Sequence, residues 1–159
     1  PQNTFVLYVY APDVFRKIRE MLGFTEEDYL KSIGPESILG NLLLGNLHTM
    51  TELVSEGKSG SLFYLTHDSQ FFVKTVREDE FHSAVGMIKS YYDHLYRNTN
   101  SLLVKTVNIY KLEVFLGRRL RNLYVLVMKN LFAEIKKPDL VFDLKGSTHG
   151  RKSKIPKGK

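Results

Sequence analysis

Residues 57–76 read GKSGSLFYLTHDSQFFVKTV, and this stretch predicts a β-hairpin. Two apolar runs, residues 62–65 and 71–73, flank the polar tetrapeptide at residues 67–70, which has the composition of a short turn. Because the chain of a hairpin runs out and returns, the glycine-containing turn before the first run and Lys74 after the second are expected at the same end.

The glycines and the lysine together predict a site for nucleotide phosphates. Gly57 and Gly60 let backbone amides approach a polyanion closely, and an amine at the same end supplies compensating charge. The pattern differs from the Walker loop, in which the lysine follows the loop directly and a helix comes next. It matches the kinase arrangement, in which a glycine-rich loop covers the phosphates and the lysine lies on the third strand. The alternative is an ordinary glycine-flanked hairpin that carries a lysine.

The composition limits the class of protein. The 159 residues are enough for one domain, or a large piece of one, with a substantial core. The chain has no cysteine, so it forms neither a disulfide nor a thiolate metal site, and this is compatible with a reducing compartment. It has no run of about 18 apolar residues that would span a membrane. The five histidines lack metal-ligand spacing.

Positive charge is concentrated at the carboxy-terminal end. Six basic residues and no acidic ones lie between Leu144 and Lys159, which leaves 17 of the 23 basic residues to balance the 17 acidic residues elsewhere. Such a segment is typical of contacts with phosphates, nucleic acid or an anionic membrane, and the alternative is a solvated, flexible end. Aromatic residues are not interleaved with these basic residues, so we do not expect nucleic acid as a partner.

The first part of the chain predicts two helices and a less regular segment. After Asp13, a good N-cap, apolar residues recur at helical spacing up to Gly23, which closes the helix. Thr25 and Asp28 have the spacing of a capping box for a second helix that runs to Lys31. The leucine-rich stretch that follows, residues 37–54, is expected to be a short helix and a loop.

One long helix is expected after the hairpin. The acidic residues 78–80 favour a helix start there. The apolar face that continues through the predicted helix consists of Phe81, Val85, Ile88, Tyr92 and Leu95.

The remaining segments predict strands and therefore an α+β fold. Residues 102–116 are rich in β-formers, residues 117–122 have the composition of an exposed connection, and residues 123–128 form a buried strand. An antiparallel sheet with the long helix packed on it, preceded by the amino-terminal helices, is the simplest arrangement of these elements.

Four further stretches, taken in order with the hairpin, carry a resemblance to a known family. They are YAPDVFRKIREMLGFTEEDYLKSIG at residues 10–34, SYYDHL at 90–95, VMKNLF at 127–132 and FDLKGSTHGR at 142–151. In order and spacing they resemble the amino-terminal half of the phosphatidylinositol phosphate kinases, and FDLKGS is the most specific match. The first stretch is more similar to the type I and type II enzymes than to the endosomal branch of the family.

The resemblance implies a nucleotide site in a kinase-like amino-terminal lobe. The turn before the hairpin resembles the loop that covers the ATP phosphates, and Lys74 resembles the strand lysine that contacts them. The end of the last strand resembles the hinge that offers backbone groups to adenine, since a chain that leaves a strand has such groups unpaired. The implied nucleotide-binding residues are Gly57, Lys58, Ser59, Gly60, Ser61, Lys74, Met128, Asn130 and Leu131.

The segment FDLKGS implies further catalytic residues. Asp143 and Lys145 would face the nucleotide phosphates and the lipid headgroup, with Lys145 as a charge stabiliser opposite Lys74. Glu80 or Asp79, at the start of the helix after the hairpin, would be the acidic partner of Lys74. The alternative is that both carboxylates only cap that helix. No metal ligand is assigned in this chain.

The implied activity is transfer of the γ-phosphate of ATP, with Mg²⁺, to a phosphatidylinositol monophosphate in an anionic membrane at its cytoplasmic face. We expect residues 1–151 to form the amino-terminal lobe and residues 152–159 a flexible basic connector. The carboxy-terminal lobe with the catalytic aspartate is expected to be absent, so we expect this chain alone to be inactive. The alternative is a truncated relative that acts as a scaffold or binds phosphoinositides. The sequence leaves open a homodimer or pairing with another kinase of the family.

Overall fold

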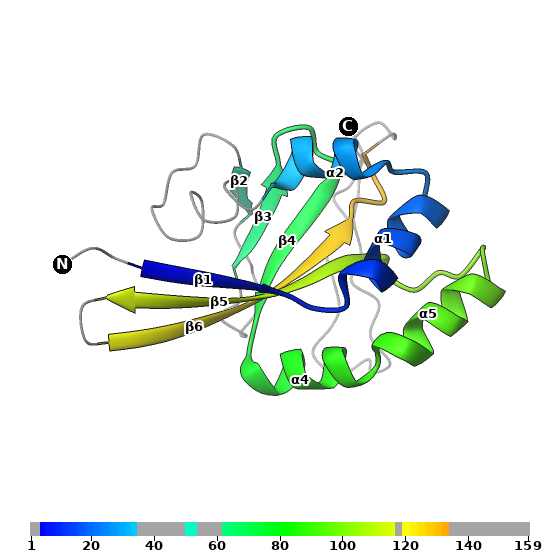
Figure 1. The fold of residues 1–159 in the computed structure, drawn as a ribbon. Helices are drawn as coiled ribbons and strands as arrows, with labels where there is room; N and C mark the ends of the chain where they lie inside the picture. Colours follow the sequence, from blue (N-terminus) through cyan, green and yellow to red (C-terminus); the bar gives the residue numbers. More distant parts are fainter. Residues whose placement is uncertain (1–3, 35–49, 54–61, 117–118, 134–159) are drawn as a thin grey trace, which may run out of the picture.

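The computed structural model describes residues 4–34, 50–53, 62–116 and 119–133, which form a six-stranded antiparallel sheet with four helices (Figure 1). This arrangement confirms the expected α+β class. Across the sheet the strands follow the order β1-β5-β6-β4-β3-β2. In chain order the elements are β1 (Thr4–Val9), α1 (Pro12–Met21), α2 (Glu26–Ile33), β2 (Met50–Leu53), β3 (Phe63–Thr66), β4 (Phe71–Val76), α4 (Glu78–Gly86), α5 (Ile88–Arg97), β5 (Thr106–Leu116) and β6 (Arg119–Lys129).

The expected hairpin is confirmed as β3 and β4. Phe63 pairs with Lys74 and Leu65 pairs with Phe72 in an antiparallel register. In the turn between the strands, Ser69 has a φ of 60°, in the left-handed region that side chains rarely adopt. β2 pairs with β3 on its other side, so β2, β3 and β4 form a meander whose third strand carries Lys74.

Helices pack against both faces of the sheet. Along β6, Val125 and Val127 belong to one core cluster, whereas Tyr124 and Leu126 belong to or pack against the other, because successive side chains of a strand point to opposite faces. α2 contributes to the first cluster, and α1, α4 and α5 contribute to the second. We call these two sides of the sheet the α2 face and the α4–α5 face.

Three strands differ from the sequence prediction. β1 was not expected, and β2 occupies residues 50–53, where a helix and loop were predicted; residues 37–49 of that prediction lie outside the described part of the chain. Arg119 and the three residues after it belong to β6 and not to an exposed connection, since they pair with the end of β5. Each of these segments gains its hydrogen bonds from a strand distant in sequence or across a tight hairpin, and local composition does not report such pairing.

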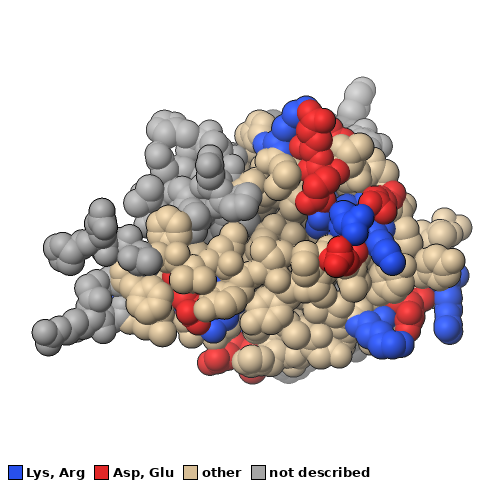
Figure 2. Space-filling view, viewed as in Figure 1, with Lys and Arg blue, Asp and Glu red and all other residues tan. Residues whose placement is uncertain are grey.

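The amino-terminal helices are confirmed, with different ends. α1 begins at Pro12 after Ala11, so Asp13 lies in the first turn, where it pairs with Arg16 at 2.9 Å; Asp13 is not the N-cap. The capping box of Thr25 and Asp28 is present, but α2 runs to Ile33, two residues beyond the expected end. Figure 2 shows basic and acidic side chains next to one another over these helices, as their ion pairs at helical spacing require.

The expected long helix is two helices. All five residues of its predicted apolar face lie in or against the core of the α4–α5 face, as expected. However, α4 ends at Gly86 and α5 begins at Ile88, with Met87 closing one helix and opening the next. The apolar spacing predicts which side is buried, but a change of helix direction that keeps this side on the sheet leaves the spacing almost unaltered.

Phe71 is fully buried at the centre of the α2 face, where it contacts Phe24 and Tyr29. The change Phe71→Ala is expected to lower the free energy of unfolding by about 3–5 kcal/mol, because it removes the ring and leaves a cavity. Urea unfolding measures this loss. The control Leu102→Ala, at a side chain that is 98% exposed, should change stability by less than about 0.5 kcal/mol. Similar losses in both variants would contradict the assigned core.

Candidate functional site

Lys74 lies on the α4–α5 face, between its two cross-strand neighbours. It is flanked by Phe63 of β3 and Leu126 of β6, and residues directly opposite in antiparallel strands share a face. Its side chain is half-buried, and its Nζ lies 5.5 Å from the centroid of the Phe63 ring. Over the part of the chain that the structure describes, no carboxylate forms an ion pair with this ammonium group.

The two carboxylates expected as partners of Lys74 have other roles. The side chain of Glu80 accepts the backbone N–H of Arg77 at 3.0 Å, and Asp79 forms a two-point contact with the Arg77 guanidinium at 2.9 and 3.0 Å. The expectation of a Lys74–Glu80 or Lys74–Asp79 pair is therefore wrong in this structure; the alternative of capping α4 holds for Glu80, whereas Asp79 pairs with the side chain of Arg77. Unpaired amides at a helix start and the adjacent arginine attract these carboxylates.

The ends of the expected phosphate-covering segment lie beside Lys74. Gly57, Lys58, Ser59, Gly60 and Ser61 are outside the described residues, but the segment that contains them joins β2 to β3. Leu53 at the end of β2 pairs with Phe63, which in turn pairs with Lys74. Two hydrogen bonds of 2.9 Å join the backbone of Leu62 to Thr75. The Leu62 carbonyl accepts the Thr75 N–H, and the Leu62 N–H donates to the Thr75 hydroxyl.

The predicted hinge lies at the end of β6, but its amides are not free. The Lys129 N–H donates to the carbonyl of Lys105, and the Asn130 N–H donates to the carbonyl of Gln70, both at 2.8 Å. The expectation of unpaired backbone groups at these two positions is therefore wrong, since neighbouring segments bind them. Leu131 is 55% exposed, and its N–H has no partner among the described residues. Of the hinge amides, it is the one left for a ligand in this part of the chain.

Asn130 and Asp68 fix the hinge to the turn between β3 and β4. The buried Asn130 amide group donates to the carbonyl of Ser69 at 2.7 Å. Asp68 organises the same turn by accepting hydrogen bonds from Ser32, Thr66 and the Gln70 N–H. Burial by itself raises the pKa of Asp68, but these hydrogen bonds outweigh burial and hold its pKa below the ordinary value.

Half-buried apolar residues surround Lys74 on its own face. Phe72 lies two residues before Lys74 on β4, and it pairs with Met128 on one side and Leu65 on the other. Together with Phe63 these residues belong to neither core cluster. They form an apolar strip between Lys74 and the hinge, which suits the flat ring of a base. Of these residues, only Met128 was predicted to belong to the site. The sequence does indicate Phe72, because residues two apart on a strand share a face and Phe72 lies two residues before Lys74.

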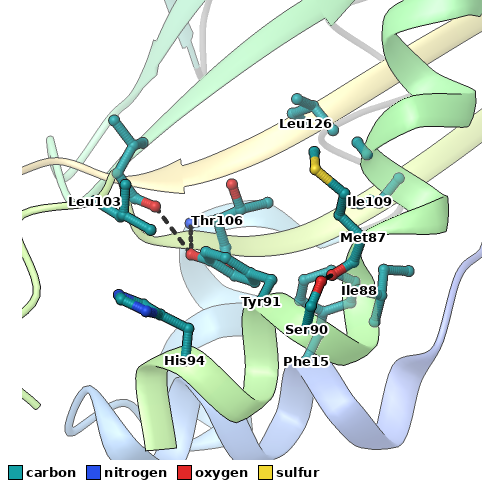
Figure 3. Close-up of a pocket in the computed structure, with 12 residues that line it drawn as sticks. Phe15, Met87, Ile88, Ser90, Tyr91, His94, Leu103, Thr106, Ile109 and Leu126 are labelled. Atoms are coloured by element: carbon teal, nitrogen blue, oxygen red, sulfur yellow. Dashed lines mark hydrogen bonds between the residues drawn. The ribbon is translucent and has the colours of Figure 1, made fainter. Parts of the chain in front are cut away.

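A cavity of about 580 Å³ lies between the sheet and the helices α4 and α5 (Figure 3). Leu126, the cross-strand neighbour of Lys74, is part of its wall. The hydroxyl of Tyr91 donates to the Val104 carbonyl at 2.9 Å and accepts the Thr106 N–H at 2.7 Å. Burial raises the pKa of Tyr91, so this hydroxyl keeps its proton and its role as a donor. The sequence did not predict the cavity, because it forms beside Met87, where the helix breaks.

Other predicted features lie outside the described residues or have no counterpart among them. Asp143, Lys145 and the basic segment 152–159 are not described. In residues 4–34, 50–53, 62–116 and 119–133, no group of three or more His, Asp or Glu side chains is arranged to hold a metal ion. Among the same residues, no helix combines the length and the apolar character that crossing a membrane requires.

An antiparallel sheet with a lysine on the third strand of a meander, followed by a helix, defines a kinase-like amino-terminal lobe. Comparison with known proteins gives the family. The family model of phosphatidylinositol-4-phosphate 5-kinase matches residues 44–159. The chain belongs to the phosphatidylinositol-4-phosphate 5-kinase family.

Individual relatives extend the similarity to the amino-terminal helices. A phosphatidylinositol 4-phosphate 5-kinase of Plasmodium falciparum is 40% identical over 152 residues, which cover 94% of this chain and 9% of the relative. Phosphatidylinositol 4-phosphate 5-kinase 1 of Arabidopsis thaliana is 37% identical over 94% of this chain and 18% of the relative. The human type-1 alpha enzyme is 35% identical over 95% of this chain and 24% of the relative. The chain thus spans less than a quarter of the length of these relatives.

The stability of the protein is expected to depend on Asp68 in acid. Because its pKa is lowered in the folded state, the ionised carboxylate stabilises the fold above about pH 4, the ordinary pKa of aspartate, and this stabilisation is lost as the pH falls through the lowered value. Urea unfolding of the wild type and Asp68→Asn should differ at about pH 7 and converge towards about pH 3. A difference that stays constant over this range would contradict the role of the ionised group.

Proposed function

We propose that this chain is the nucleotide-binding lobe of a lipid kinase that transfers the γ-phosphoryl group of ATP to a phosphatidylinositol monophosphate. The position of Lys74 carries the proposal. This amine lies beside the ends of the glycine-containing segment and on the same face as Met128 at the hinge. Family membership supports the same activity. The names of the relatives specify phosphatidylinositol 4-phosphate, which we propose as the monophosphate.

Lys74 neutralises the phosphates of ATP in the proposed complex. Phosphoryl transfer depends on positioning and on positive charge around the transferred group, and Lys74 has no competing carboxylate among the described residues. The glycine-containing segment, with its two serines, supplies backbone and hydroxyl donors to the same phosphates. The adenine ring lies on the apolar strip of Phe63, Leu65, Phe72 and Met128, and the Leu131 N–H donates to its edge.

The reaction itself is an in-line displacement. A bond forms between an inositol hydroxyl oxygen and the γ-phosphorus while the bond to the bridging oxygen breaks and ADP leaves. Mg²⁺, when bound, offsets the negative charge of the phosphates. We propose that Lys145 adds a second positive charge and that Asp143 lies in the same segment facing the headgroup.

Lys74→Met is expected to weaken ATP binding by roughly 10- to 100-fold, which corresponds to the loss of one charge-assisted contact. Calorimetric titration of the purified chain with ATP and Mg²⁺ measures the affinity. The control Lys89→Met removes an equal charge from α5, at a side chain that is 91% exposed, and should leave affinity unchanged. Equal affinity in wild type and Lys74→Met would refute the assigned role of Lys74. Equal losses in the two variants would show a general charge effect instead.

The basic segment is proposed to hold the protein at an anionic membrane. Residues 152–159 contain four lysines and no acidic residue. Removing this segment is expected to lower binding to vesicles of phosphatidylcholine with phosphatidylinositol 4-phosphate by about tenfold or more, since each basic residue near such a surface contributes about 1 kcal/mol. Vesicle co-sedimentation measures this binding, and high salt should abolish the difference. Vesicle binding by the shortened chain equal to that of the full chain would contradict the proposal.

A further inference from the structure

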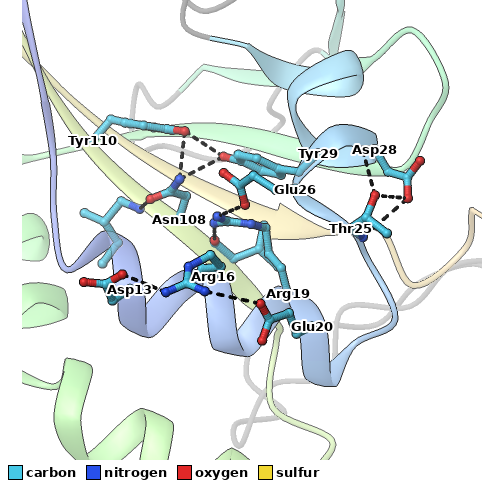
Figure 4. A network of polar contacts seen from close by, with 12 residues as sticks. Asp13, Arg16, Arg19, Glu20, Thr25, Glu26, Asp28, Tyr29, Asn108 and Tyr110 are labelled. Carbon is cyan, nitrogen blue, oxygen red and sulfur yellow. Dashed lines mark hydrogen bonds and ion pairs between the residues drawn. The ribbon is translucent and has the colours of Figure 1, made fainter.

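The amino-terminal helices wrap around the edge of the sheet where β5 begins (Figure 4). β1 pairs with β5 only from Tyr110 to Phe115, and the Tyr10 N–H adds a bond to the Ile109 carbonyl. Before Ile109, β5 therefore has no neighbouring strand on this side in the described part of the chain. α1 packs on the α4–α5 face and α2 on the α2 face, so their connection crosses this edge.

Arg19 of α1 binds the edge of β5 where β1 does not pair with it. Its side chain is 4% exposed, and one guanidinium nitrogen donates to the carbonyl of Val107 at 3.0 Å. The other terminal nitrogen contacts Glu26 at 2.5 Å, and the guanidinium lies over the ring of Tyr29 at 4.2 Å from its centroid. Val107 is the extra residue of a β-bulge, because Thr106 and Asn108 pair with consecutive residues of β6. The arginine thus donates a hydrogen bond to a carbonyl that has no partner strand on this edge of the sheet.

Asn108 fixes the same bulge from the α2 face. Its amide donates to the hydroxyls of Tyr29 at 3.1 Å and Tyr110 at 2.8 Å, and these two hydroxyls share a hydrogen bond of 2.8 Å. Burial raises the pKa of Tyr29 well above its ordinary value, so this hydroxyl stays neutral. The start of β5 is therefore bound to both amino-terminal helices.

Two routes lead from these helices to the hinge, the first through a hydrogen bond and the backbone of residues 105–107, the second through consecutive hydrogen bonds. The first runs from Arg19 to Val107, and the residue two positions earlier, Lys105, accepts the Lys129 N–H. The second runs from Ser32 of α2, whose hydroxyl donates to Asp68. Asp68 accepts the Gln70 N–H at 3.1 Å, and the Gln70 carbonyl accepts the Asn130 N–H at 2.8 Å.

The two routes meet at consecutive amides of the hinge, from opposite sides. Lys129 is held by the residue just before β5, and Asn130 is held by the turn between β3 and β4. Each of these supports is itself bound to an amino-terminal helix, although α1 and α2 lie before the span that the family model matches. The helices thus contact both segments that hold the hinge amides.

We propose that Arg19 and Ser32 are positioning residues for the adenine side of the nucleotide site, acting through the two hinge amides. This inference rests on the proposed nucleotide-binding function. It separates the two halves of the site. Phosphate binding depends on Lys74, whereas adenine binding depends on the hinge and hence on α1 and α2.

Residue-resolved hydrogen exchange tests the positioning directly. Arg19→Met should speed exchange of the Lys129 amide, and Ser32→Ala that of the Asn130 amide, by about tenfold beyond any change in the β1–β5 pairing. Ile18→Val, at a fully buried position of α1 without a bond to β5, serves as the matched control for lost stability. Ile18→Val should speed the exchange of all slowly exchanging amides equally. The same uniform pattern in Arg19→Met and Ser32→Ala would overturn the inference.

Ligand binding tests the functional consequence. Arg19→Met should weaken binding of ATP roughly threefold or more, because a displaced hinge couples to the base, and should leave binding of inorganic tripolyphosphate unchanged. Equally weakened binding of ATP and tripolyphosphate would overturn the inference, since the variant should affect only the contacts with adenine. If the wild-type chain binds neither ligand, the proposed function fails, whereas the exchange experiment still decides whether the helices hold the hinge.

Discussion

The antiparallel pairing of β4 between β3 and β6 is the constraint on which the candidate site depends. It places Lys74 between Phe63 and Leu126, on the face that also carries Met128. A shift of one residue in this register would move the lysine to the opposite face, into an apolar core. Phe71, fully buried on that opposite face, opposes such a shift because it would have to leave the core. The hydrophobic core on the α2 face therefore helps to keep Lys74 on the opposite face of the sheet.

The candidate site combines a secured hinge with a lysine that lacks a carboxylate partner among the described residues. At the hinge, the amides of Lys129 and Asn130 are bound within the protein, whereas the Leu131 N–H has no partner among the described residues and is open to a ligand. At the other end, Glu80 binds an amide of its own helix start instead of Lys74. An apolar strip between them suits a ligand that is flat at one end and anionic at the other, which is the chemical character of a nucleotide.

The break between α4 and α5 gives the helical layer its shape. Because α4 begins directly after β4, the strand that carries Lys74 leads into the helices that cover the same face. The change of direction at Met87 keeps the apolar residues of both helices on the sheet and leaves a cavity beside Leu126. Tyr91 bridges this cavity to the start of β5, so α5, like the amino-terminal helices, supports the segment that accepts the Lys129 N–H.

The sequence by itself determined the α+β class, the β3–β4 hairpin, the capping box of α2 and the lysine at the expected end, because these features depend on local spacing and composition. The tertiary structure decided what distant segments do to one another. It paired β1 and β2 into the sheet, bound the hinge amides to Lys105 and Gln70, and gave Glu80 to its own helix. Backbone groups bind whichever partner the folded chain brings near, and a sequence pattern specifies the groups but not their partners.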